Sequence, residues 1–236
     1  MSNLRLFHLD NITENTTSLL SKEHTHYVVN VMRLKRGSNL NFFNKSGEWL
    51  SEIVFLDRDR VEVKILDKIK EPTITSNIEL AICLVKKTPM ETILQKATEL
   101  GVSKIVPIIS DRTEIKELNF ERANKIVIEA TEQSNQMSPP EISKVTKLIN
   151  YIELLESKIL FFADVNSSNK LELKNFKSGI TNCILIGPEG DFSPSEREHI
   201  LKKSSVIPFS LSKNILRTDT AVISAISLVN FINNNH

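Results

Sequence analysis

One segment, residues 184–196 with the sequence ILIGPEGDFSPSE, restricts the fold of this chain more than any other. It begins with three consecutive apolar residues, which is typical of a strand covered on both faces of a sheet. Gly187 and Gly190 then bracket a loop whose backbone can turn sharply and approach a ligand. Ser193 and Glu196 predict a capping box at a helix start, with a proline at the first helical position. Open α/β sheets bind ligands in such loops, although an ordinary strand-to-helix turn has the same pattern.

The order of predicted elements indicates two domains of different classes. The first, residues 1–72, contains strand-like segments and one amphipathic helix over residues 23–34. Its strands NLNFFN and EWLSEIVFL are joined as a predicted hairpin across Lys45, Ser46 and Gly47. After a predicted linker over residues 72–77, strands alternate with helices. The second domain, residues 73–236, is therefore predicted to be α/β, with a mainly parallel sheet and helices on both faces.

Composition excludes several classes of protein. The chain has 30 Lys and Arg against 29 Asp and Glu, so its net charge of +1 provides no global field for nucleic acid or membrane. Any nucleic-acid site would be a local patch. No apolar run is long enough to span a bilayer and the N-terminus lacks the apolar core of a signal peptide, so we expect a soluble cytoplasmic protein. Cys83 and Cys183 lie in apolar strand-like runs, where we expect neither a disulfide nor a metal site.

The C-terminal segment is predicted to be an apolar helix that begins near Thr218, a plausible N-cap, and continues to Ile232. Nearly every turn of it is apolar on several sides. Such a helix must be buried widely, either in the core or against a second subunit.

Five segments of the sequence resemble one known family. They are HYVVNVMRLKRG, KTPMETILQKATELGV, EATEQS, IGPEGDFS and LSKNILRTDTA. In this order they are similar to the bacterial small-subunit ribosomal RNA uridine-N3 methyltransferases, which belong to the SPOUT superfamily of S-adenosylmethionine-dependent enzymes. The resemblance implies a PUA-like β-barrel at the N-terminus, a SPOUT-type parallel sheet with a C-terminal trefoil knot, and an obligate homodimer. General topology rules argue against knots, which are rare.

The resemblance also implies a cofactor pocket built from two loops and the end of one strand. Glycine loops let backbone groups read adenine and ribose, while apolar side chains flank the ring. The residues implied in cofactor binding are Ala163, Ile186, Gly187, Pro188, Glu189, Gly190, Leu211, Ser212, Asn214, Ile215, Leu216 and Thr220. No metal is needed, because the sulfonium methyl group is already electrophilic and mainly has to be aligned with a nucleophile.

Two residues are implied in catalysis. Uracil N3 is a poor nucleophile while it holds its proton, so the reaction requires deprotonation and stabilisation of charge on the ring oxygens. Arg217 is the first candidate for the electrostatic role, and Glu189 is a candidate base or cofactor contact. Each residue also has an ordinary interpretation. Arg217 would form a salt bridge to Asp219, and Glu189 would be a solvated loop glutamate.

The expected RNA substrate is ribosomal RNA of the small subunit or the assembled small subunit. Because N3 lies on the pairing edge of uracil, the target base must be unpaired or flipped. The candidate RNA contacts are Arg33, Lys35, Arg36 and Arg112, with Lys86 and Lys87 as further members of a local patch. The alternative interpretation of Arg33, Lys35 and Arg36 is a solvated helix end whose charges complement the helix dipole. The alternative for Arg112 is an ordinary surface arginine.

The sequence departs from the family pattern at four positions. Asp191 and Ser212 stand where the two loops commonly have glycine, Asp219 replaces a glutamate, and Gln136 stands where an arginine is common. A second hypothesis is therefore an RNA-binding protein of the same fold that has lost catalysis. A third, an unrelated nucleotide-binding enzyme, is disfavoured because G-x-G-x-x-G is absent and GPEG lacks the lysine of a P-loop.

Overall fold

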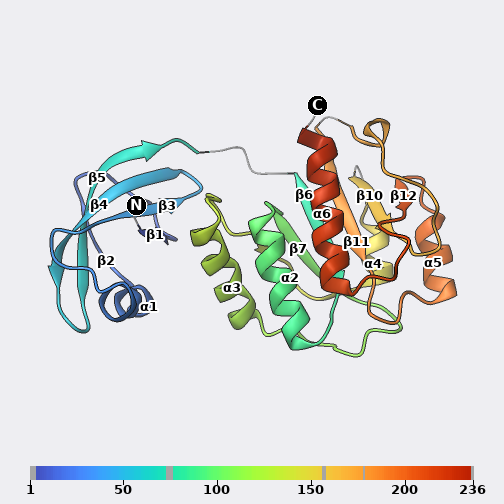
Figure 1. The fold of residues 1–236 in the computed structure, drawn as a ribbon, viewed down its shortest axis with the longest axis horizontal. Coiled ribbons are helices and arrows are strands. Elements are labelled where there is room, and N and C mark those ends of the chain that lie inside the picture. Colours follow the sequence, from blue (N-terminus) through green and yellow to red (C-terminus); the bar gives the residue numbers. More distant parts are fainter. Residues whose placement is uncertain (1–3, 73–76, 156–157, 178, 235–236) are drawn as a thin grey trace. The chain divides into compact units, whose positions relative to one another are not determined.

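The computed structural model describes residues 4–72, 77–155, 158–177 and 179–234 and divides the chain into two compact units (Figure 1). The first unit comprises Met1–Thr75 together with Thr131–Ser138. The second comprises Ser76–Ala130 and Pro139–His236. Most of the predicted linker, and the position just after the predicted boundary at residue 72, lie outside the described residues.

The first unit contains a five-stranded sheet with the strand order β1-β3-β4-β5-β2. Its strands are β1 (Leu4–Phe7), β2 (Thr17–Leu19), β3 (Asn39–Asn44), β4 (Gly47–Leu56) and β5 (Val61–Lys70). β1 pairs with β3 in parallel and the other pairs are antiparallel. The predicted hairpin is confirmed, because Asn44 pairs with Gly47 across the turn between β3 and β4. Alternate strand residues such as Leu40 and Val63 are fully buried and form the core of this unit.

The helical part of the first unit is shorter than predicted. Helix α1 (Lys22–His26) continues as a single π-helical stretch, Tyr27–Val31. Arg33 follows in the left-handed region at φ 50°, and the Leu34 N–H donates to the Val28 carbonyl at 3.0 Å. A left-handed residue closes a helix C-terminus in this way. The helix therefore ends before Leu34, where the apolar periodicity had placed its end.

The segment Thr131–Ser138 joins the first unit through bonds that involve the side chains of Arg5 and Glu132. The Arg5 guanidinium donates to the carbonyls of Thr131 (3.4 Å), Glu132 (3.3 Å) and Gln136 (3.1 Å), and its Nε lies 3.1 Å from Glu48 Oε2. Glu132 Oε1 accepts from the Phe7 N–H at 2.8 Å. These bonds tie β1 to residues more than a hundred positions further along the chain.

The second unit is built on a seven-stranded sheet with the order β12-β10-β11-β6-β7-β8, in which β9 also pairs with β7. Its strands are β6 (Ile78–Cys83), β7 (Lys104–Ile109), β8 (Glu141–Ile142), β9 (Thr146–Lys147), β10 (Lys158–Ala163), β11 (Thr181–Ile186) and β12 (Val206–Phe209). Every pair in it is parallel, which confirms the predicted sheet. β8 and β9 are two-residue strands that the sequence pattern did not predict.

Helices cover both faces of this sheet (Figure 1). Side chains of α2 (Lys87–Glu99), α3 (Phe120–Gln133) and α6 (Thr218–Asn234) share one core with Leu80 and Ile82. Side chains of α4 (Leu148–Glu153) and α5 (Pro194–Leu201) share the other with Ala81 and Cys83, and a short 3-10 helix spans Leu173–Asn175. Because successive strand residues point to opposite faces, β6 is buried on both sides.

The predicted helix starts differ in accuracy. The capping box at α5 is confirmed: Ser193 Oγ accepts from the Glu196 N–H, and Glu196 accepts from the Ser193 N–H. For α2 the sequence Thr88-Pro89-x-Glu91 predicts Thr88 as the N-cap, but the N-cap is Lys86, two residues earlier. Thr218, the predicted N-cap of α6, is already helical.

Within the described residues, no helix combines the length and apolarity needed to cross a membrane.

Candidate functional site

Three loops of the second unit leave the sheet at the same edge. Since the strands are parallel, their carboxyl ends lie together, and Phe162 of β10 is level with Leu185 of β11 and Pro208 of β12. We call the loops that follow these strands the β10 loop (residues 164–172), the GPEG loop (residues 187–193) and the C-terminal loop (residues 210–217). They contain or adjoin all the predicted cofactor residues, with Ala163 and Ile186 as the last residues of β10 and β11 and Thr220 in the first turn of α6.

The backbone of the GPEG loop is shaped by one close contact and one left-handed residue. A Cβ atom on Gly187 would lie 2.9 Å from Cε2 of the buried Phe192 ring, so any side chain there would force the ring to shift. A Cβ atom on Gly190 would meet only Arg112, at 3.8 Å. The left-handed residue is Asp191, with φ 59°, and its Oδ1 accepts from the Phe192 N–H at 2.8 Å. Aspartate tolerates this conformation better than most non-glycine residues, so the loop closes without the glycine of the family pattern.

The loop after β7 fastens the GPEG loop from one side. The Asp111 N–H donates to Glu196 Oε1 at 2.8 Å, and Ser193 Oγ donates to Asp111 Oδ2 at 2.7 Å. The Arg112 guanidinium donates to the Gly190 carbonyl at 2.9 Å. Arg112, predicted as an RNA contact, therefore also holds the GPEG loop. Glu196 is only 5% exposed and serves both the capping box and this inter-loop bond.

An ion pair fastens the start of the β10 loop to α5, the helix that follows the GPEG loop. Asp164 comes directly after Ala163, its side chain is 1% exposed, and Arg197 Nη2 lies 2.7 Å from its Oδ2. Burial acts to raise the pKa of Asp164, but hydrogen bonds from the Arg197 side chain and the Asn166 N–H outweigh it and hold the pKa below its usual value. The Asp164 N–H donates to the Phe209 carbonyl of β12 at 3.0 Å. Asp164 thus connects the ends of β10 and β12 with helix α5, and it was not among the residues predicted from the sequence.

The C-terminal loop is less tightly held. The Ser210 N–H donates to the Asn169 carbonyl at 2.8 Å, and Ser212 Oγ accepts from the Asn214 N–H at 3.0 Å. Ser212, another departure from the family pattern, therefore forms a local turn bond. Leu211 packs against the core, whereas Ile215 is 94% exposed. The polar residues Ser212 and Asn214 are exposed as well.

The two predicted catalytic residues are both exposed at this edge. Glu189 lies in the GPEG loop and Arg217 ends the C-terminal loop. In the part of the chain that the structure describes, the Arg217 side chain forms no ion pair, and Asp219 instead accepts from the Thr220 N–H at 2.8 Å. The salt bridge considered as the ordinary interpretation of Arg217 is therefore not formed.

Of the remaining predicted RNA contacts, Lys86 and Lys87 are exposed at the start of α2 in the second unit, and the other three lie on the first unit. Arg33, Lys35 and Arg36 are exposed, next to the partly exposed apolar side chains of Val31 and Met32. Cys83 and Cys183 are buried, and no disulfide joins them. Burial raises the pKa of each thiol to about 12. Over the described ranges, no three His, Cys, Asp or Glu side chains form a group that could hold a metal ion.

Comparison with known families identifies both units. The family described as RNA methyltransferase domain matches residues 70–230, and the RNA methyltransferase PUA domain matches residues 20–66. The ribosomal RNA small subunit methyltransferase E of Rickettsia conorii is 32% identical over 233 residues, which are 97% of this chain and 95% of that protein. The enzyme of the same name from Aquifex aeolicus is 30% identical over 97% of this chain and 100% of its own length.

Solved structures agree with these sequence relatives. The ribosomal RNA small subunit methyltransferase E of Neisseria gonorrhoeae, bound to S-adenosyl methionine, has a TM-score of 0.86 and 25% identity over 98% of both chains. A Legionella pneumophila protein in complex with the bound cofactor SAM has a TM-score of 0.85 and 26% identity, also over 98% of both chains. The chain belongs to the ribosomal RNA small subunit methyltransferase E family.

Proposed function

We propose that this protein transfers a methyl group from S-adenosylmethionine to N3 of a uridine in small-subunit ribosomal RNA. Its family membership makes it an S-adenosylmethionine-dependent ribosomal RNA methyltransferase. The observation that carries the proposal is the convergence of the β10 loop, the GPEG loop and the C-terminal loop at one edge of a parallel sheet. Such an edge is where α/β sheets bind their ligands.

The residues at this edge fit S-adenosylmethionine. Ile215 is 94% exposed and Leu216 half-buried, so apolar side chains are available to cover an adenine ring. Gly190 leaves the backbone of the GPEG loop accessible, since an added Cβ there would meet only Arg112 at 3.8 Å, and Ala163 and Thr220 complete the proposed contacts. When bound, this cofactor supplies an electrophilic methyl group, so the protein needs no metal for the transfer.

Arg217 and Glu189 are the proposed catalytic residues. Uracil N3 must lose its proton before it reacts, and the resulting negative charge spreads onto the ring oxygens. The Arg217 guanidinium is exposed and forms no ion pair with the described residues, so it is available to stabilise that charge. Glu189 is an exposed carboxylate in the facing loop and is the proposed acceptor of the N3 proton.

RNA binding is assigned to both units. We assign residues 1–72 to a PUA-like β-barrel domain that holds RNA through Arg33, Lys35 and Arg36, which can contact phosphates without reading sequence. Residues 73–236 form the proposed SPOUT domain, where Arg112 has a second role towards RNA besides its bond to Gly190.

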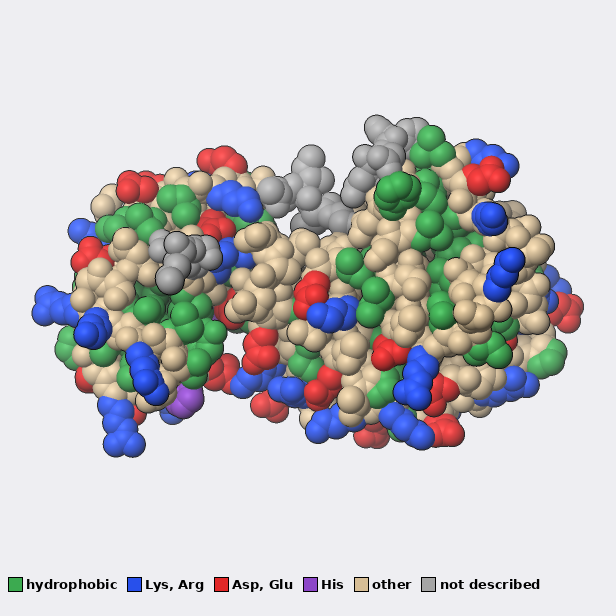
Figure 2. All heavy atoms as spheres, in the orientation of Figure 1, with side chains coloured by type: hydrophobic (Ala, Val, Ile, Leu, Met, Phe, Trp, Pro, Cys, Tyr) green, Lys and Arg blue, Asp and Glu red, His purple; other side chains and the backbone are tan. Residues whose placement is uncertain are grey.

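The proposal includes a trefoil knot and a homodimer. The β10 loop lies over the end of β12, where Asn169 bonds the C-terminal loop, and this arrangement supports a knot in which the chain end passes that loop. The outer face of α6 supports dimerisation. Phe231 is 70% exposed, and Figure 2 shows apolar side chains gathered over the region where α6 lies in Figure 1. Exposed apolar patches of this kind mark protein interfaces.

A direct test combines methyl transfer with nucleotide mapping. The purified chain is incubated with labelled S-adenosylmethionine and either unmodified small subunits or free ribosomal RNA, and the RNA is digested and analysed by mass spectrometry. We expect label in N3-methyluridine at a single position. Label on another base or on another atom of uridine would refute the N3 assignment. Cofactor binding without any transfer would support the alternative, an RNA-binding protein of this fold with weakened catalysis.

A further inference from the structure

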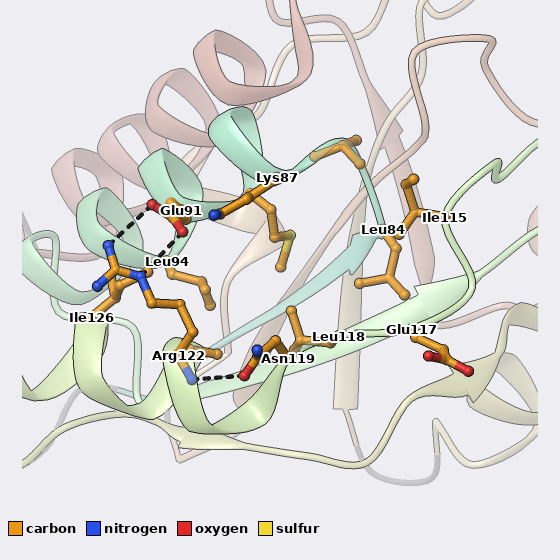
Figure 3. Close-up of a pocket in the computed structure, with 13 residues that line it drawn as sticks. Leu84, Lys87, Glu91, Leu94, Ile115, Glu117, Leu118, Asn119, Arg122 and Ile126 are labelled. Carbon is orange, nitrogen blue, oxygen red and sulfur yellow. Dashed lines mark hydrogen bonds and ion pairs between the residues drawn. The ribbon is translucent and has the colours of Figure 1, made fainter.

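The second unit contains a pocket separate from the three loops. It lies between α2, α3 and the loop after β7 and has a volume of about 470 Å³ (Figure 3). All the residues that line it belong to the second unit. Its inner walls are aliphatic and include Leu84, Met90, Leu94 and Ile126, which are at most 7% exposed, with the half-buried Ile115 and Leu118 on the loop side. Pockets of this size hold small organic ligands rather than ions.

The rim of the pocket is polar and partly fixed. Arg122 of α3 forms two bonds to Glu91 of α2, Nε to Oε1 at 3.1 Å and Nη2 to Oε2 at 3.2 Å (Figure 3). Asn119 Oδ1 accepts from the Arg122 N–H at 2.9 Å, so its amide NH₂ remains as a donor. Lys87 and Glu117 also line the pocket, and neither forms an ion pair with any residue that the structure describes.

This combination of walls and rim suits a nucleobase. A flat heterocycle buries its faces between apolar side chains and uses donors and acceptors along its edge. Asn119 offers a donor and Glu117 an acceptor, while Lys87 offers a cation to a phosphate. A purely apolar occupant, such as a side chain from a second copy of this chain, would leave this rim unused.

We propose that the pocket between α2 and α3 receives one splayed-out nucleotide of the single-stranded part of the RNA substrate. The base lies between Met90 and Leu118, its edge meets Asn119 and Glu117, and its phosphate lies beside Lys87. This inference rests on the proposed function, because it assigns a further contact to the same RNA.

The position of the pocket in the sheet agrees with this role. Leu84 follows β6 directly, and its N–H donates to the Ile108 carbonyl of β7 at 3.0 Å. β6 also pairs with β11, where Ile82 is level with Ile186, the residue before the GPEG loop. The pocket therefore opens at the same edge of the sheet as the proposed cofactor loops. A nucleotide held here would anchor the RNA strand next to the reacting base.

The test uses a short single-stranded RNA from the substrate that carries photoreactive 4-thiouridine at successive positions. The full chain is irradiated with this RNA without cofactor, and cross-linked peptides are identified by mass spectrometry. We expect one position of the RNA to cross-link to residues 84–94 or 115–126, and uridine 5′-monophosphate in excess to reduce that product. Cross-links confined to other parts of the chain would overturn the proposal.

Two variants with a matched control accompany the cross-linking. Leu118→Trp fills the pocket from its loop side and Lys87→Gln removes its cation, whereas Lys116→Gln removes an exposed charge from the same loop without touching the pocket. We expect the first two to raise the KM for RNA by roughly tenfold, the effect of one lost base contact, with the Kd for S-adenosylmethionine unchanged. Lys87→Gln keeps the test valid if the tryptophan variant does not fold.

The outcomes separate this inference from the proposed function. Absence of methyl transfer by the wild type would count against the function, whereas the cross-link is measured without cofactor and judges the pocket alone. An unchanged KM in both pocket variants would overturn the inference. The inference would also be overturned if Leu118→Trp were monomeric in light scattering where the wild type is a dimer, while its RNA affinity stayed at the wild-type value. The pocket would then hold a side chain from a second copy of this chain.

Discussion

The GPEG loop and the C-terminal loop lie at the same edge of one sheet but are held very differently. The first is fixed by the capping box of α5, by Asp111 and by the bond from Arg112 to Gly190. The second has one backbone bond to the β10 loop and a local serine turn, and its Ile215 is 94% exposed. One wall of the proposed site is therefore preorganised by the chain itself, while the other offers side chains that still lack partners.

This difference separates two kinds of residue. Apart from the exposed Glu189, changes in the GPEG loop should act through the stability and shape of the protein, because Asp191, Phe192 and Ser193 are already bonded or packed within the fold. Changes in the C-terminal loop should leave stability nearly unaffected and act on ligand binding or chemistry. Single substitutions in and around the two loops test that division.

Arg217→Ala should reduce turnover by about a hundredfold, the effect of removing one charge-stabilising donor from an active site. Arg217 is exposed and forms no side-chain bond within the described residues, so the free energy of unfolding should stay within about 0.5 kcal/mol of wild type. Single-turnover methyl transfer and calorimetric titration with S-adenosylmethionine separate kcat from cofactor affinity.

Lys213→Ala is the matched control for Arg217, because it removes an exposed cation from the same loop. It should retain wild-type turnover. If Arg217→Ala turns over normally, Arg217 has no part in the mechanism. If both variants lose activity equally, the loop acts through its general positive charge.

Asp164→Asn should destabilise the protein by about 2 kcal/mol at neutral pH, less than for a fully buried ion pair because 36% of the Arg197 side chain is exposed. The pKa of Asp164 is lower in the folded protein than in the unfolded chain, where it is about 4. The stability that the ionised carboxylate contributes is therefore fully present above the unfolded-state pKa, and it is lost as the pH falls through the folded-state pKa. Urea unfolding at pH 7 and below pH 4 should therefore show a larger difference between variant and wild type at pH 7.

Glu198→Gln provides the comparison on the same helix. Glu198 pairs with Lys202 on α5, but both side chains are more than two-thirds exposed, at 69% and 68%. Its substitution should leave the midpoint of urea unfolding at the wild-type value, because solvent screens an exposed ion pair. Equal effects of the two substitutions would show that the Asp164–Arg197 pair does not organise the site.

Gly187→Ala should destabilise the protein by about 1–2 kcal/mol, because the new Cβ would lie 2.9 Å from the Phe192 ring. That ring is 4% exposed and packs edge-on against Phe162, with 5.6 Å between centroids, so it has little room to move. Gly190→Ala should be nearly neutral in thermal unfolding, since its nearest neighbour would be 3.8 Å away. A neutral Gly187→Ala would mean that the GPEG loop is less rigid than its bonds indicate.

The features that could be predicted from sequence are local or follow from regular alternation. The capping box joins residues three positions apart, and the hairpin joins Asn44 to Gly47, so both are encoded in a few neighbouring residues. The common edge of the three loops follows from parallel strands, whose carboxyl ends coincide.

The features that were missed depend on contacts between distant residues. Ser193 and Asp111 are 82 positions apart, and Asp164 and Arg197 are 33 apart. Arg5 bonds carbonyls some 130 positions away, which places Thr131–Ser138 in the first unit against the sequence-based division. No periodicity encodes such pairs. The only sequence signal for Asp164 was a carboxylate directly after a buried strand, at the edge where a site was expected.

Asp191 gives the smallest and most specific prediction. At φ 59° its backbone favours glycine, and its carboxylate compensates in part by accepting from the Phe192 N–H. Asp191→Gly loses that bond but relieves the backbone, so stability and cofactor affinity should both stay close to wild type. Asp191→Ala loses the bond and keeps the strain, which should cost about 1 kcal/mol in urea unfolding. If alanine proves as stable as glycine, the left-handed turn does not set the shape of the GPEG loop, and the aspartate in place of the family's glycine needs another explanation.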